Sequence, residues 1–222
     1  MFMFWNCFWI VRSKNNNMNE DQIKKAAIIL VDPYNDFLSE GGKLWPMTKT
    51  TVVETGILEN LKSLLTAGRE KGIQVFYAPH RQTTVGDYMN WKFMNPSHNG
   101  SHKHQLFAKG SWGGEFHPDL APKEGDIIAQ NHWTASGFAN TDLDLLLRMN
   151  GKEYLIIAGM RANTCIDSTA RYAVELGYHV TLIKDGIAAF NWEEVNVTTH
   201  TNFPAYGHEL LSSAEFVTKL NS

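Results

Sequence analysis

The sequence predicts an α/β protein with a three-layer, open, doubly wound sheet of about six parallel strands flanked by helices. Short, nearly continuous apolar runs alternate along the chain with longer segments of helical period. Such runs are typical of strands buried on both faces, as the strands of a parallel sheet are. The chain has 222 residues, 43% of them hydrophobic, which is enough for one sizeable core. No Pro- or Gly-rich linker divides it, so we expect a single domain.

The expected strands follow from the apolar runs, and the expected helices from the segments between them. The runs predict strands at 26–32, 73–78, 126–130, 154–159 and 179–185, with a possible sixth at 208–212. Apolar periodicity, together with capping residues or a terminal glycine, predicts helices within 54–72, 140–151 and 164–178. Ligands of such sheets bind beyond the carboxyl ends of the strands, so chemically active side chains are expected there.

The segment from His80 to Pro122 is long and rich in His, Asn, Gly, Ser and aromatic residues. A segment of this kind within a compact domain predicts a functional lid or an interface. His98, His102 and His104 lie within it at a spacing that suggests zinc. Their polar surroundings favour a solvated loop instead, and we expect no metal site.

Charge, cysteine content and the start of the chain limit the partners and the compartment. Lys and Arg number 20 against 23 Asp and Glu, which argues for a small-molecule partner and against nucleic acid. Two distant cysteines predict no disulfide, a cytoplasmic location and a free thiol at Cys165. We expect residues 1–17, which include Cys7, to form an extension outside a single domain of residues 18–222. Their aromatic run is too short to span a membrane, and no membrane partner is expected.

Three reactive side chains follow predicted strands. Asp32 ends the first, His132 lies just beyond the third, and Cys165 lies beyond the fourth, where a helix is expected to begin. A helix start lowers the pKa of a thiol, so the position predicts a nucleophile, with Asp32 as its base and backbone N–H groups as oxyanion donors. Each residue alone also fits a structural role, as a buried thiol, a turn aspartate or a hydrogen-bonded histidine. Their coincidence at one sheet edge favours catalysis.

Four blocks of sequence resemble, in order, the motifs of the isochorismatase-like cysteine hydrolases. They are "AAIILVDPYNDF", "AKGSWGGEFHPDLAPKEGD", "SGFANTDLDLLL" and "AGMRANTCIDSTARYAVELGYHVTLIKDGIAAF", and the resemblance covers about residues 24–216. It implies a six-stranded parallel sheet, an Asp-Lys-Cys triad that hydrolyses small amides or ureides through a thioester, and no cofactor. Asp32 matches the base and Cys165 the nucleophile. The implied oxyanion donors are the backbone N–H groups of Arg161 and Cys165, beside a cis peptide at Met160 and Arg161.

The chain departs from the family pattern at the lysine of the triad. Counting back from Ser136 places His132 at that position, and counting forward from Asp126 places Asn131 there. A protonated histidine can replace the lysine charge only over a narrower pH range. A second departure concerns metal, because "YAPHRQ" keeps His80 but has Ala78 where the metal-dependent nicotinamidases carry Asp. That class is therefore disfavoured.

The resulting hypothesis is a metal-independent cysteine hydrolase for a small amide or ureide, closest to the ureidoacrylate amidohydrolase branch. Two alternatives stay open: a vinyl-ether hydrolase of isochorismatase type, in which Asp32 acts as the acid, and a catalytically impaired member that binds a ligand or a protein. The family resemblance also implies a homo-oligomer. Substrate-binding residues are expected at Phe37, Tyr88, Trp91, Trp112, Asn131, Trp133 and Arg161.

Overall fold

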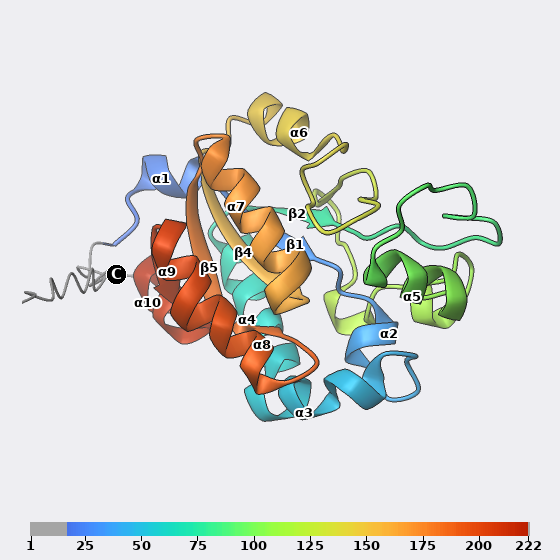
Figure 1. Cartoon of the computed structure of the whole chain (residues 1–222). Helices are drawn as coiled ribbons and strands as arrows, with labels where there is room; N and C mark the ends of the chain where they lie inside the picture. Colours follow the sequence, from blue (N-terminus) through green and yellow to red (C-terminus); the bar gives the residue numbers. More distant parts are fainter. Residues whose placement is uncertain (1–16, 222) are drawn as a thin grey trace, which may run out of the picture.

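A six-stranded, fully parallel sheet forms the centre of the protein (Figure 1). The computed structural model describes residues 17–221, so Cys7 and all but the last residue of the expected extension lie outside the described residues. The strands, in the order β3-β2-β1-β4-β5-β6, confirm the predicted fold class and all six expected positions. Their bounds are β1 Ala26–Val31, β2 Gln74–Ala78, β3 Ile127–Ile128, β4 Tyr154–Met160, β5 His179–Ala188 and β6 Glu209–Leu211.

Helices cover both faces of the sheet, as Figure 1 shows. Alternate residues of a strand point to opposite faces, and β1 is buried along its whole length. Its even-numbered residues join a core with α3, α4 and α10, and its odd-numbered residues join a second core with α6, α7, α8 and α9. The helix bounds are α1 Glu20–Lys24, α2 Asn35–Leu38, α3 Trp45–Thr55, α4 Ile57–Glu70, α5 Pro96–His104, α6 Leu143–Met149, α7 Asp167–Glu175, α8 Trp192–Asn196, α9 Phe203–Tyr206 and α10 Ser213–Asn221.

The strand order reverses between β1 and β4, and this is where the site lies. From β1 the chain proceeds to β2 and β3 toward one edge, and from β4 to β5 and β6 toward the other. Val31 at the end of β1 pairs with Gly159 near the end of β4. A Cβ at position 159 would lie 2.1 Å from the Val31 carbonyl oxygen, and the backbone φ of Gly159 is +121°. The close contact and the positive φ each require glycine at this position. The close approach brings the two strand ends, and the loops after them, to one crevice.

The segment between β2 and β3 contains a helix where we expected a solvated loop, and that expectation is wrong. Helix α5 begins at Pro96 after Asn95, whose side chain accepts a hydrogen bond from the His98 backbone N–H. His98 is buried, at 5% exposed, beneath the rings of Tyr88 and Trp91. Among residues 17–221, no helix is long and apolar enough to cross a membrane.

Candidate active site

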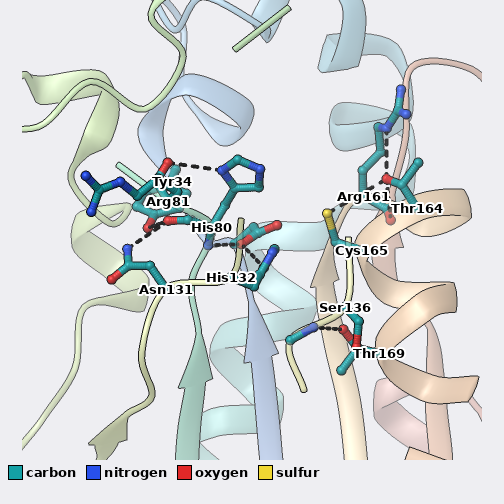
Figure 2. Close-up of polar contacts among 12 residues, drawn as sticks. Tyr34, His80, Arg81, Asn131, His132, Ser136, Arg161, Thr164, Cys165 and Thr169 are labelled. Carbon is teal, nitrogen blue, oxygen red and sulfur yellow. Dashed lines mark hydrogen bonds and ion pairs between the residues drawn. The ribbon is translucent and has the colours of Figure 1, made fainter. Parts of the chain in front are cut away.

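Asp32, His132 and Cys165 come together at the crevice between β1 and β4. Asp32 follows β1, His132 lies beyond β3, and Cys165 lies in a π-helical turn, Ala162–Ile166, between β4 and α7. One carboxylate oxygen, one imidazole nitrogen and the sulfur all lie within 4.8 Å of one another. Figure 2 labels His132 and Cys165 in a close-up of the surroundings. The fold therefore gathers the three reactive residues that the sequence singled out.

Asp32 is held by its backbone and by its two histidine neighbours. Its φ is +50°, a left-handed conformation that is uncommon outside glycine and is often found at functional sites. The Oδ1 atom accepts a hydrogen bond of 2.6 Å from the His80 backbone N–H and lies 3.1 Å from His132 Nε2. The Oδ2 atom is buried without a hydrogen-bond partner among the described residues. One oxygen is thus fixed, and the other is left for a further ligand or proton.

The surroundings of His132 favour its imidazolium form. Nδ1 lies 3.0 Å from the Thr134 carbonyl oxygen and Nε2 lies 3.1 Å from the Asp32 carboxylate, so both nitrogens face acceptors that a protonated ring can satisfy. Burial alone would lower the pKa of His132, but the charge and hydrogen bond of Asp32 outweigh it and raise the pKa above 6.5. His132, and not Asn131, makes the charged contact with Asp32.

His80, which the sequence analysis did not place in the site, is the neutral counterpart of His132. Its Nδ1 lies 3.0 Å from the Arg81 carbonyl oxygen, which makes Nδ1 the donor and leaves Nε2 as an acceptor. Burial and the neighbouring His132 charge lower its pKa to about 4. Its own carbonyl accepts hydrogen bonds from Tyr34 Oη at 2.7 Å and Asn131 Nδ2 at 2.8 Å. Its sequence signals were its position just after β2 and its match to a histidine of the nicotinamidase pattern in "YAPHRQ".

The Cys165 thiol titrates in the direction opposite to our expectation. Burial raises its pKa well above 9.0, and the negative charge of Asp32 and a side-chain hydrogen bond to Asp32 raise it further. Hydrogen bonds from the Thr164 hydroxyl and the Arg161 backbone N–H lower it, but by less. The start of a helix could lower the pKa of an exposed thiol, but here Cys165 is buried beside a carboxylate. The thiol therefore keeps its proton at neutral pH until that proton can pass to a base.

The turn after β4 has the backbone that the family resemblance implies. The peptide bond between Met160 and Arg161 is cis. The Arg161 backbone N–H hydrogen-bonds the Cys165 sulfur. The Arg161 side chain bends away from this N–H, with its guanidinium 3.9 Å from the centre of the Phe190 ring and Nη1 3.5 Å from Glu194 Oε2.

A cavity of about 720 Å³ opens above Asp32 and Cys165. Helix α5 forms one wall, apolar side chains form much of the rest, and basic side chains lie at Lys43, His104 and Arg161. Asp32 is its only acidic lining residue among those described. The lining residues are Asp32, Phe37, Lys43, Leu44, Met47, His80, Pro96, Ser97, Gly100, Ser101, His104, Leu106, Phe107, Arg161, Thr164, Cys165 and Phe190.

Two of the seven expected substrate-binding residues, Phe37 and Arg161, line this cavity, and the other five do not. Tyr88, Trp91 and Trp133 pack edge-to-face or tilted against one another instead, with the Arg81 guanidinium 4.5 Å from the Trp133 ring centre. Trp112 is 49% exposed. Asn131 uses its amide to hold the His80 carbonyl. Aromatic composition could not show which rings face the cavity and which support α5.

Comparisons with known proteins identify the family of this chain. Residues 26–215 match the isochorismatase domain family. The ureidoacrylate amidohydrolase of Yersinia enterocolitica is 33% identical over 171 residues, which cover 72% of this chain and 74% of that protein. Its counterpart in Agrobacterium fabrum is 30% identical over 177 residues, covering 72% and 75%. A cysteine hydrolase from Pseudomonas syringae pv. phaseolicola superposes with a TM-score of 0.77 at 25% identity, covering 94% of this chain and 98% of that one. The chain belongs to the isochorismatase family of hydrolases, in the branch of the ureidoacrylate amidohydrolases.

Proposed function

We propose that this protein is a cysteine hydrolase that cleaves a C–N bond of a small ureide or amide through a thioester on Cys165. The observation that carries the proposal is the meeting of Asp32, His132 and Cys165 at one point, with Asp32 and Cys165 lining the cavity. The names of the relatives in the same branch, ureidoacrylate amidohydrolases, support this choice of bond.

The proposed reaction starts from a neutral thiol. Asp32 takes the thiol proton as the sulfur attacks the carbonyl carbon, and the Arg161 and Cys165 backbone N–H groups stabilise the oxyanion. The C–N bond then breaks, and the departing nitrogen receives the proton from Asp32. Asp32 next accepts a proton from water, whose oxygen attacks the thioester carbonyl. The C–S bond breaks, the acid or carbamate is released, and Asp32 returns the proton to the sulfur, which restores the thiol. The His132 imidazolium stays beside Asp32 and stabilises its negative charge.

The lining of the cavity supports a substrate with a carboxylate at the end remote from the scissile bond. Lys43 and Arg161 both line the cavity, and the Lys43 ammonium donates to the Gln105 carbonyl, a neutral acceptor that leaves its charge uncompensated. Arg161 is partly neutralised by Glu194. Phe37 and Phe107 offer apolar surface for a short carbon chain between the two ends.

The test is release of ammonia from ureidoacrylate, from its saturated analogue N-carbamoyl-β-alanine and from propylurea, which lacks the carboxylate. Cys165→Ala is expected to reduce turnover to background, whereas Cys7→Ala, the other cysteine of the chain, serves as the matched control. Circular dichroism establishes that each variant is folded. Turnover by Cys165→Ala within about tenfold of the parent would overturn the thioester mechanism.

A further inference from the structure

We propose that Asp32, His132 and Cys165 form a binding site for a thiophilic divalent cation such as Zn²⁺, and that the bound ion blocks the nucleophile. The ion would occupy the same three residues that the proposed hydrolysis uses, and it takes no part in that reaction. The site exists because a histidine stands where the family resemblance implies a lysine, and an imidazole can be a metal ligand whereas an ammonium ion cannot.

The donor set is one that Zn²⁺ prefers. The ion binds cysteine sulfur, histidine nitrogen and carboxylate oxygen at about 2.0–2.3 Å, so the ligand atoms of a tetrahedral site lie roughly 3.3–3.8 Å apart. The three donor atoms here, one from each residue, already lie within 4.8 Å of one another. A contraction of at most about 1.5 Å brings them to zinc distances.

A second observation points to a missing ligand at the same place. Asp32 is fully buried, and its Oδ2 atom has no hydrogen-bond partner among the described residues. A buried carboxylate oxygen without a partner is costly, and a cation would satisfy it. The Asp32 Oδ1 atom would keep its hydrogen bond from the His80 backbone N–H while Oδ2 binds the ion.

The outer contacts of His132 suit a metal ligand. Its Nδ1 lies 3.0 Å from the Thr134 carbonyl oxygen, which fixes the ring and leaves Nε2 as the ligating nitrogen once its proton is lost. Binding would also displace the Cys165 thiol proton, so two protons leave as two metal bonds form. Asp32 and Cys165 line the cavity, which provides both an entry path and space for a fourth ligand from water. With its lone pair bound to the ion, the sulfur could not attack a carbonyl.

The experiment measures metal binding without substrate, so its result does not depend on whether the proposed hydrolysis is correct. The full chain carrying Cys7→Ser is titrated with CdCl₂, and the ultraviolet sulfur-to-cadmium charge-transfer band is recorded. We expect one Cd²⁺ per chain and loss of the band in Cys165→Ser. ZnCl₂ is expected to slow alkylation of Cys165 by about tenfold or more, with recovery on addition of a chelator. MgCl₂ should have no effect, because Mg²⁺ prefers oxygen ligands.

Matched variants show whether Cd²⁺ binds at this site or at another histidine of the chain. His132→Lys keeps a positive charge beside Asp32 and is expected to weaken Cd²⁺ binding by about tenfold or more. Asp32→Asn, which keeps the side-chain shape, should weaken it in the same direction. His200→Lys replaces an exposed histidine that does not line the cavity and should leave binding unchanged. Equal Cd²⁺ affinity in the parent, His132→Lys and Asp32→Asn would overturn the site, and stimulation of hydrolysis by Zn²⁺ would overturn the blocking role.

Discussion

The Nε2 atom of His132 lies 3.1 Å from Oδ1 of Asp32, and both side chains are buried. Because Nδ1 of the same ring faces the Thr134 carbonyl, this contact is an ion pair between an imidazolium and a carboxylate. The family resemblance implies a lysine at this position. A lysine would keep its charge across the neutral and mildly alkaline range, whereas a histidine keeps it only below its own pKa.

Hydrolysis is therefore expected to decline on the alkaline side. The pKa of His132 is raised above 6.5 and the ring is charged below it, so kcat/KM should fall as the pH rises through that raised pKa. His132→Lys should move the decline to higher pH while the acid limb stays in place. The measurement is the pH profile of kcat/KM for both proteins. If kcat/KM declined over the same alkaline pH range in the parent and in His132→Lys, the charge of His132 would not support the reaction.

Asp32→Asn tests the proposed base with little change of shape. Asparagine tolerates the left-handed backbone at φ +50°, and its side-chain oxygen can still accept the His80 backbone N–H. We expect kcat to fall by about 10²- to 10⁴-fold, the usual contribution of general acid–base catalysis. Steady-state kinetics together with a thermal melt separate this loss from unfolding. A folded variant with nearly normal kcat would remove Asp32 from the mechanism.

Lys43→Met tests recognition of a carboxylate at the cavity wall. Methionine retains much of the apolar stem of lysine and removes the charge, so kcat/KM for N-carbamoyl-β-alanine should fall by about three- to tenfold. Propylurea, which lacks the carboxylate, should be hydrolysed as before. Equal losses for both substrates would mean that Lys43 shapes the cavity without recognising an anion.

The neutral state of His80 makes the folded protein sensitive to acid. In the unfolded chain His80 would bind a proton near 6.5, but in the folded chain only near 4. The free energy of unfolding should therefore decrease as the pH falls from about 6.5 to 4, by up to about 3 kcal/mol from this residue. His80→Asn should remove that part of the decrease. Burial also lowers the pKa of His98, His117 and His179, so the informative quantity in urea unfolding is the difference between variant and parent. Parallel pH dependences would contradict the assignment.

The sequence predicted the sheet well because its signals are local. Buried apolar runs mark β1, β2, β4 and β5; Asp32 follows β1 directly, and Cys165 lies in the turn after β4. The site depends on contacts between distant segments, and these left no comparable pattern. Residue counting could not choose between Asn131 and His132, because the choice rests on which side chain reaches Asp32, 100 residues away. Helix α5 was missed because its composition is polar, although Asn95 and Pro96 formed a recognisable start.

The most direct test of the account is the rate of alkylation of Cys165 against pH, in the Cys7→Ser chain with and without Asp32→Asn. Burial and the Asp32 charge both raise the pKa of the thiol, so the midpoint should lie above the free-thiol value of about 8.5. Removal of the carboxylate charge should shift that midpoint downward, even though hydrolysis is lost. A midpoint that stays fixed or moves upward in Asp32→Asn would contradict the direct coupling of Asp32 to Cys165.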